Sequence, residues 1–465
     1  MDRLEVAMAG NDPLPAAAPW WPGLWRSLDS VQQPEWAGPE LSRVVRLLAA
    51  LPPLVAPADV WALRRELREV QAGRAFVLQG GDCAEHLGRR AVLDAQAKTR
   101  LLGRMAATIS ERTGLPVVTI GRLAGQFAKP RSRPVEEVGG RLLPAFRGLI
   151  VNGQEPTEAA RRPRPSRLVE AYATAWDVLD ELARQAGRAP EQRAVVPVNQ
   201  WLGARRWSAA PVPLSTDGAA YGRTARAGRG WVHHGLWASH EALILDYEEP
   251  LARRDPETGR WYLGSAHLPW IGYRSNHPDG GHVRFLAELN NPVAVKVGPD
   301  TDPQALVRLC ARLDPRRTPG RLTLVSRQGA AVLRARLPRL VAAVRDAGHP
   351  VIWMCDPMHG NTVRTASGLK TRHYDDIGAE LTGFFDVLTG MGQWPGGVHL
   401  ELAADDVTEC VGGGGPQLAD LPAAYRTLCD PRLNDVQAVA LTELTVDLLR
   451  APGAGRVPVL SAAAR

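Results

Sequence analysis

The sequence predicts an α/β fold, a (β/α)8 TIM barrel with an N-terminal extension and an irregular insertion. Short apolar runs recur from residue 75 onward, helical patterns separate them, and charged residues follow directly after many of the runs. Near-continuous apolar runs are typical of strands buried on both faces of a parallel sheet. A doubly wound sheet is the alternative. We favour the barrel because barrel active sites are built from the carboxyl ends of many different strands.

The first part of the chain is predicted to form an N-terminal arm and helices packed on the barrel, over residues 1–70. Free tails are poor in aromatic residues. This segment instead holds Trp20, Trp21, Trp25 and Trp36. The remaining residues, 71–465, are predicted to form the catalytic barrel.

Six apolar runs are the expected strands, and each ends abruptly in glycine, proline or charged residues: Ala75–Leu78, Pro116–Ile120, Pro292–Val295, Leu322–Val325, Val351–Trp353 and Val398–Leu400. The clearest helix covers Leu168–Arg184, with Ser166 as the expected N-cap. Residues 186–235 interrupt the alternation, since they are rich in glycine, alanine, arginine and proline and show no clear periodicity. They are predicted to form the insertion.

Composition excludes several classes of protein. Five cysteines are too few and too scattered for a disulfide scaffold. The net charge is +7, but the arginines are spread along the chain without a basic run, which favours small anionic substrates over nucleic acid. No apolar run is long enough to span a bilayer, and the N-terminus does not resemble a secretory signal. We therefore expect a cytoplasmic protein with no membrane or nucleic-acid partner.

A metal site is the first chemical hypothesis. Cys83, His359 and Glu401 each follow an apolar run, and Asp430 lies in the segment Leu428–Asn434. A thiolate, an imidazole and two carboxylates suit a borderline divalent cation such as Mn, Co, Zn or Fe. Taken singly, each of these residue types is more often structural. Their shared position at strand ends makes the set a candidate.

Cations near strand ends form a second candidate set. Only four of the 56 Lys and Arg residues are lysine, so a retained lysine can mark a position that needs a compact ammonium group. Lys98 lies in a helical-looking stretch, and we ascribe it to chance. Strand-end cations beside glycine and proline are typical of sites for phosphates and carboxylates. The candidates are Arg122, Lys129, Arg131, Arg274, Lys296, Arg327 and Lys370.

Other conspicuous residues are predicted to be structural or exposed. The histidines His233, His234 and His240 lie in the irregular insertion or at its edge. The acidic pairs Glu248–Glu249 and Asp405–Asp406 are expected on solvated faces. The glycine run Gly412–Gly415 lacks the Lys-Ser/Thr of a phosphate loop and is expected to be a flexible loop.

Several long motifs resemble those of the class II (plant-type) 3-deoxy-D-arabino-heptulosonate 7-phosphate (DAHP) synthases. They are Gln79–Glu85, Gly121–Ser132, Ser239–Leu243, Gly320–Arg327, Cys355–Asn361, Gly368–His373 and Thr408–Cys410. The resemblance extends from about Trp25 to Leu449. It implies a metal-dependent barrel enzyme, a homodimer or higher homo-oligomer, that condenses phosphoenolpyruvate with erythrose 4-phosphate and releases phosphate at the entry to the shikimate pathway of aromatic amino acid biosynthesis.

The resemblance also implies a role for individual residues. The family's metal ligands, for Mn²⁺, Co²⁺ or a similar ion, fall on Cys83, His359, Glu401 and Asp430. Its phosphoenolpyruvate-binding cations fall on Arg122, Arg274, Lys296 and Arg327. Lys129, Arg131 and Ser132 match the segment that faces the aldose phosphate. We expect the catalytic groups among these to be Lys129, Lys296, Arg327 and His359.

The chain departs from the family pattern near the substrates. Where the family reads Trp-Ile-Gly-Glu-Arg-Thr-Arg, this chain has Tyr273 for the acid and Asn276 for the second arginine. Gly235 stands where the family has another acid. Two alternatives therefore remain: a specialised secondary-metabolism paralogue that uses a modified aldose phosphate (amino-DAHP synthase-like), and a catalytically weakened regulatory paralogue. The intact metal set, Lys296 and Arg327 argue against a silent protein.

One further expectation concerns two of the cysteines. Cys429 directly precedes the proposed ligand Asp430. We therefore expect Cys429 to lie close to Cys83.

Overall fold

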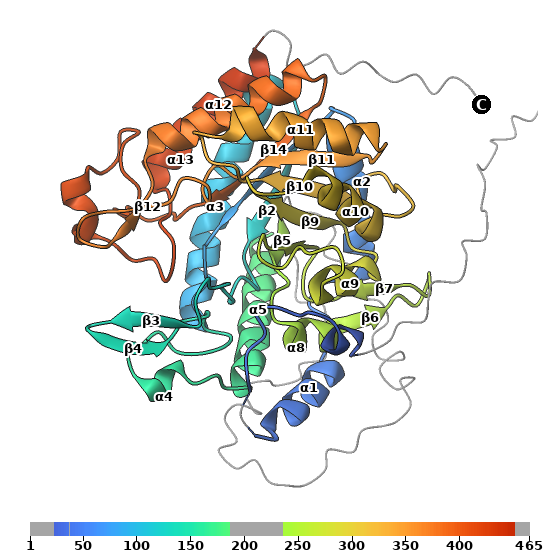
Figure 1. Ribbon diagram of the computed structural model, residues 1–465, viewed down its shortest axis with the longest axis vertical. Helices are drawn as coiled ribbons and strands as arrows, with labels where there is room; N and C mark the ends of the chain where they lie inside the picture. The colour runs from blue at the N-terminus through green and yellow to red at the C-terminus, as the bar shows by residue number, and fades with distance from the viewer. Residues whose placement is uncertain (1–22, 37, 187–235, 452–465) are drawn as a thin grey trace, which may run out of the picture.

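The computed structural model describes residues 23–36, 38–186 and 236–451. Eight parallel strands close into a barrel in the spatial order β1-β14-β11-β10-β9-β8-β5-β2 (Figure 1). The prediction of a barrel rather than a doubly wound sheet is confirmed. The strands are β1 (Phe76–Gly81), β2 (Val117–Arg122), β5 (Trp237–Glu241), β8 (Leu268–Ile271), β9 (Val293–Val297), β10 (Leu322–Ser326), β11 (Val351–Cys355) and β14 (Pro395–Glu401).

The six expected strands correspond to β1, β2, β9, β10, β11 and β14. The two strands that the apolar runs did not reveal are β5 and β8. β5 begins directly after the irregular segment 186–235 and contains His240 and Glu241, so its pattern is interrupted by polar residues. β8 has only four residues and includes Pro269, which weakens its strand pattern.

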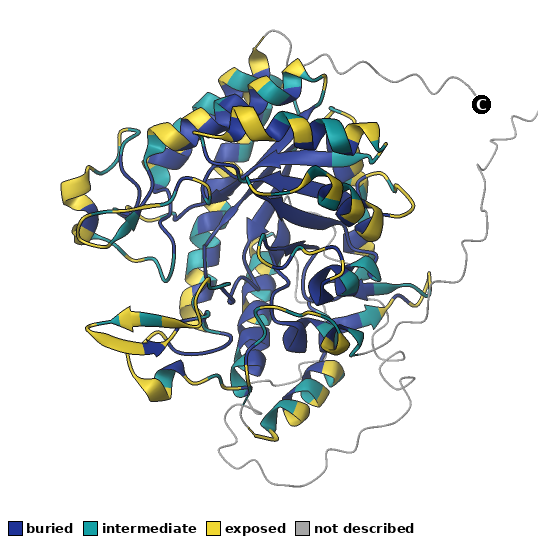
Figure 2. Ribbon diagram, in the orientation of Figure 1, coloured by how far each residue is buried: buried dark blue, intermediate teal, exposed yellow. Residues whose placement is uncertain are grey.

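Helices pack around the barrel, and Figure 2 shows buried barrel strands beside helices whose outward faces are exposed. Neighbouring helices pack in the series α9, α10, α11, α12, α13, α3 and α5. The predicted helix at Leu168–Arg184 is α5. Ser166 is its first helical residue and Pro165 occupies the N-cap position, so the expected cap at Ser166 is wrong. The bounds are α3 (Arg89–Thr113), α5 (Ser166–Gln185), α9 (Gly281–Ala287), α10 (Pro303–Leu313), α11 (Leu333–Asp346), α12 (Tyr374–Gly390) and α13 (Asp435–Arg450).

Helix α2 (Pro57–Gln71) covers the amino end of the barrel. Its side chains Leu63, Leu67 and Val70 belong to the same buried cluster as strand residues that point into the barrel, such as Ile120. Gln71 accepts a hydrogen bond from the amide of Gly320 just before β10 (2.7 Å). Helix α1 (Glu40–Ala50) packs beside α5. Apolar packing of α2 therefore covers the amino end, and the candidate site lies at the carboxyl end.

Smaller elements complete the described part of the chain. Three antiparallel hairpins project from the barrel: β3 (Val135–Val138) with β4 (Arg141–Pro144), β6 (Ala252–Arg254) with β7 (Trp261–Leu263), and β12 (Val363–Arg364) with β13 (Lys370–Thr371). The short helices are η1 (Leu24–Ser27), α4 (Glu158–Arg161), α8 (Leu245–Glu248), η2 (Glu249–Leu251) and η3 (Leu418–Ala423). No helix in the described ranges is long and apolar enough to cross a membrane. The predicted insertion falls almost entirely outside the described residues.

Candidate active site and metal centre

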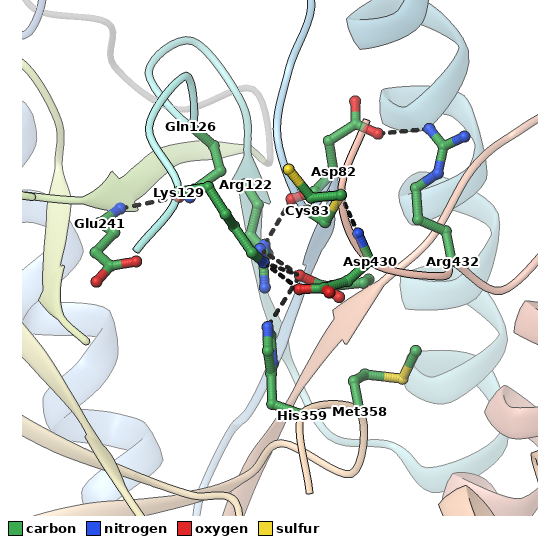
Figure 3. A network of polar contacts seen from close by, with 12 residues as sticks. Asp82, Cys83, Arg122, Gln126, Lys129, Glu241, Met358, His359, Asp430 and Arg432 are labelled. Atoms are coloured by element: carbon green, nitrogen blue, oxygen red, sulfur yellow. Dashed lines mark hydrogen bonds and ion pairs between the residues drawn. The ribbon is translucent and has the colours of Figure 1, made fainter. Parts of the chain in front are cut away.

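Polar residues from several strand ends converge at the carboxyl end of the barrel (Figure 3). Arg122 ends β2, Glu241 ends β5 and Glu401 ends β14. His359 follows β11, and Cys83 follows β1. Because the barrel closes, residues that are hundreds of positions apart in the sequence share one small volume.

Three of the four predicted metal ligands lie together. Donor atoms of His359, Glu401 and Asp430 all lie within 4.8 Å of one another. His359 Nδ1 lies 2.8 Å from Asp356 Oδ2, while Nε2 lies 3.0 Å from Glu401 Oε1. If Nδ1 donates to Asp356, the Nε2 lone pair faces a carboxylate, and a cation between them relieves the repulsion. This donor set fits a divalent metal.

Cys83 lies beside this group but outside its 4.8 Å set. Its sulfur accepts a hydrogen bond from the amide of Asp430 at 3.3 Å. Burial opposes the thiolate, but contact with Cys429 and the charge of Lys129 lower the pKa of Cys83 to about 7. The expected proximity of Cys83 and Cys429 is confirmed, and both are free thiols. A thiol that ionises near neutral pH suits a metal ligand.

The two carboxylates of the set are surrounded by cations. Arg122 Nη2 lies 3.0 Å from Glu401 Oε1, and Lys129 Nζ lies 2.5 Å from Asp430 Oδ2. Two further cations contact the same carboxylates. Arg372, which the sequence analysis missed, pairs with Glu401 (2.8 Å), and the candidate Lys370 pairs with Asp430 (2.7 Å). Burial opposes ionisation, but the cations keep the pKa of both carboxyls well below their usual values.

Lys296 lies inside the barrel wall, buried on β9, with Nζ 2.5 Å from Asp356 Oδ2. Burial lowers the pKa of Lys296 to about 8, and Asp356 partly offsets this effect. The same Asp356 carboxylate contacts His359. One buried acid therefore holds both a predicted phosphoenolpyruvate-binding cation and a predicted metal ligand.

Arg327 approaches the same centre from β10. Its Nη2 donates to the carbonyl oxygen of His359 at 2.7 Å. The ring of Tyr273 lies against its guanidinium, with a distance of 5.2 Å from Cζ to the ring centroid. A Cβ on Gly298 would lie 2.6 Å from the Tyr273 ring, so the aromatic side chain needs glycine there. Asn276, the second departure, donates to the carbonyl of Lys296 at 2.9 Å.

Three predicted substrate residues lie on the rim. Arg274 Nη2 donates to Ser132 Oγ at 2.8 Å, and both side chains are exposed. Arg131 forms an ion pair with Glu136 of β3. Within the described residues, neither Arg131 nor Ser132 forms a hydrogen bond or ion pair with the metal set. Their role at a substrate stays a prediction.

Glu241 is a functional candidate that the strand patterns did not reveal. Its Oε1 is buried without a hydrogen-bond partner among the described residues, and a Cβ on Gly272 would lie 1.9 Å from it. Burial raises the pKa of the Glu241 carboxyl, while four groups around it act in the opposite direction: Lys129, Arg274, His359 and Lys296. The signal available in the sequence was its place in the motif Ser239–Leu243.

A second layer of ion pairs supports the centre. Lys98, ascribed to chance from its sequence context, is buried and pairs with Asp82, the neighbour of Cys83. Arg432 contacts Asp82 (2.7 Å) on one side and Glu409 (2.7 Å) on the other. This network links β1 to the segment that carries Asp430, and the interpretation of Lys98 as incidental is wrong.

The remaining predictions have mixed outcomes. His240 is structural as expected: it is buried in β5, with Nε2 2.8 Å from Glu248. Glu248 is therefore buried, and its assignment to a solvated face is wrong, because α8 turns it into the fold. The pair Asp405–Asp406 is exposed as predicted. His233, His234 and Gly235 lie outside the described residues.

Comparison with known proteins identifies the family. The chain is 41% identical over 443 residues to a phospho-2-dehydro-3-deoxyheptonate aldolase of Streptomyces coelicolor, covering 92% of this chain and 96% of that protein. It is 40% identical to the AroG enzyme of the same description from Mycolicibacterium smegmatis, covering 94% and 98%. A solved aldolase structure from Francisella tularensis SCHU S4 aligns with a TM-score of 0.49 at 13% identity, covering 92% and 99%. The profile of the class-II DAHP synthetase family matches residues 20–446. The chain therefore belongs to the class-II DAHP synthetase family.

Proposed function

We propose that the carboxyl end of the barrel carries out the DAHP synthase reaction, in which phosphoenolpyruvate and erythrose 4-phosphate condense and phosphate leaves, at the entry to the shikimate pathway. The observation that carries the proposal is the convergence of the His359, Glu401 and Asp430 donors within 4.8 Å, ringed by buried cations. Two phosphorylated anions repel each other in water, and such a ring of cations offsets that repulsion.

The phosphoenolpyruvate end of the site is assigned to Lys296, Arg327, Arg122 and Arg274. Arg122 and Lys296 are buried beside the carboxylates that hold them, so their donors are fixed before the substrate arrives. Charge-assisted hydrogen bonds to phosphate or carboxylate contribute about 1.5–3 kcal/mol each. Glu241, buried beside Lys296 and Arg274, would orient water or a proton near the reacting carbon.

A divalent metal such as Mn²⁺ or Co²⁺ would be held by His359, Glu401 and Asp430, with Cys83 as the fourth ligand. When bound, it would supply Lewis-acid polarisation of the aldehyde carbonyl. Asp356 would keep the His359 ring oriented through Nδ1. Lys129, which contacts Asp430 here, would be released from that carboxylate and could hold the aldose phosphate together with Arg131 and Ser132.

The direct test is a phosphate-release assay with both substrates on the full chain. We expect release only when phosphoenolpyruvate, erythrose 4-phosphate and a divalent metal are all present. Release that needs only phosphoenolpyruvate would indicate hydrolysis and contradict the proposed condensation. We also propose a homodimer or higher homo-oligomer in the cytoplasm, and light scattering of the purified chain tests the assembly.

A second candidate is the same condensation with a modified aldose phosphate, as in a secondary-metabolism paralogue. Tyr273 favours it, because a phenol ring lies against Arg327 where the family has an acid. Loss of a carboxylate makes this part of the site more cationic. We expect poor turnover with erythrose 4-phosphate, improved by Tyr273→Glu. Efficient turnover that this substitution does not improve would leave the standard reaction as the only candidate.

A further inference from the structure

A large cavity lies at the opposite end of the barrel from the active site. Its volume is about 1150 Å³, and its lining comes largely from α10, α9 and the β6–β7 hairpin. Figure 1 labels these elements. Its lining includes Asn290 and Arg321, which lie just before β9 and β10. Arg64, from the helix that covers the amino end, lines it as well. The cavity is therefore separate from the residues that surround Glu401.

The lining is far richer in arginine than the chain as a whole. Eight of its 22 residues are arginine, whereas the composition of the chain would place two or three there. Only three acids line it, and two of them are engaged: Glu288 with Arg284 (3.7 Å) and Asp279 with Arg312 (3.0 Å). Among the described residues, six lining arginines have no acid within 4.0 Å: Arg64, Arg254, Arg260, Arg308, Arg316 and Arg321.

Two of these arginines are not ordinary solvated cations. Arg321 is only 6% exposed, and its Nη1 has no hydrogen-bond partner among the described residues. Burial lowers the pKa of Arg321 to about 10, with Asp314 acting against this change. Burial also lowers the pKa of Arg64, as do the charges of Arg260 and Arg316. These cations converge and repel one another, a cost that a bound anion would remove.

We propose that this cavity binds a small molecule that carries two or more phosphate groups. Planar guanidinium groups bind phosphate oxygens in pairs, and several of them around one hollow match a chain of phosphates better than a single charge. The volume is of the size that takes a nucleotide-sized ligand. The site would be regulatory, because catalysis in this fold belongs to the carboxyl end.

The test is calorimetric titration of the full chain with inorganic tripolyphosphate. Saturating phosphoenolpyruvate occupies the catalytic cations, and metal-free buffer prevents the polyphosphate from acting by sequestering a metal. The cavity variant combines Arg260→Gln, Arg308→Gln and Arg316→Gln. The matched control removes the same charge from exposed helix positions in Arg100→Gln, Arg336→Gln and Arg339→Gln. Circular dichroism verifies that both variants fold.

We expect one tripolyphosphate to bind per chain. Its affinity should be about tenfold or more lower in the cavity variant and unchanged in the control. ATP that binds more tightly than tripolyphosphate would identify a nucleotide, and equal affinity would identify the phosphate chain alone. Absence of binding, or equal weakening in both variants, would overturn the proposal. Tighter binding of a hexaglutamate peptide would overturn it too, in favour of an acidic protein partner. The titration involves no turnover, so its failure leaves the proposed condensation untouched.

Discussion

The two ends of the barrel differ in whether their cations are paired with acids. At the carboxyl end, the buried cations in the described part of the chain are paired with acids, as Arg122 is with Glu401 and Lys296 with Asp356. At the amino end, α2 contributes apolar packing, and the arginines of the cavity are mostly without acids. The carboxyl end is thus preorganised by internal ion pairs, whereas the amino end combines an apolar seal with an excess of positive charge.

This difference indicates which end of the barrel serves function and which serves stability. Buried ion pairs are expensive to desolvate and add little net stability, so their concentration at one end indicates function. Apolar burial is the main favourable contribution to folding, so the contacts of α2 are expected to stabilise the fold rather than take part in catalysis. Substitutions at the two ends should therefore separate activity from folding.

The largest effect is expected at the metal ligands. His359→Gln and Glu401→Gln should each lower kcat by at least about a hundredfold, because losing a ligand costs more than losing the outer partners that support it. Metal analysis by mass spectrometry should show a matching loss of bound metal. Asp356→Asn is the graded control, with an expected loss of about 10–100-fold. Full metal occupancy in both ligand variants would exclude this ligand set.

At the amino end, substitution is expected to lower the free energy of unfolding without changing catalysis. Leu67→Ala removes a buried side chain between α2 and the barrel interior and should cost about 2–5 kcal/mol in the free energy of unfolding. Denaturant unfolding measures this cost. The KM for phosphoenolpyruvate of the folded variant should stay unchanged. A variant of normal stability with altered KM would contradict the division between the two ends.

Substitution of the phosphoenolpyruvate-binding cations should weaken substrate binding rather than lower stability. Lys296→Met and Arg327→Met each remove a charge-assisted contact of about 1.5–3 kcal/mol, or roughly ten- to a hundredfold in affinity. Calorimetry with phosphoenolpyruvate measures the change, and Arg308→Gln at the opposite end serves as the matched control. Unchanged affinity in both methionine variants would remove these residues from the binding site.

A smaller effect is expected from pH. Burial lowers the pKa of Lys296 to about 8, so its ammonium is charged below that pH and loses its proton above it. The value of kcat/KM for phosphoenolpyruvate should therefore fall as the pH rises through about 8. In Lys296→Arg the cation does not titrate in this range, and the alkaline fall should disappear even if affinity is reduced. An identical alkaline limb in this variant would assign the titration to another group.

Much of the fold and part of the site could be predicted from the sequence, for a physical reason. A strand buried on both faces leaves an apolar run, and a charged residue that ends the run stands out, as at Lys296 and Glu401. Glu241 did not stand out because β5 is interrupted by polar residues. Lys98 and Glu248 lie in helices, where a charged residue is common on an exposed face, so neither stood out in the sequence. Their burial depends on Asp82 and His240, partners that no local pattern indicates.

Metal-dependent turnover tests the central claim most directly. The chain should be treated with a chelator, assayed for phosphate release from phosphoenolpyruvate and erythrose 4-phosphate, and assayed again after Mn²⁺ or Co²⁺ is added. We predict that chelation abolishes release, that either ion restores it in the wild type, and that neither restores it in His359→Gln. Full activity after chelation, or restoration in the His359 variant, would contradict the account.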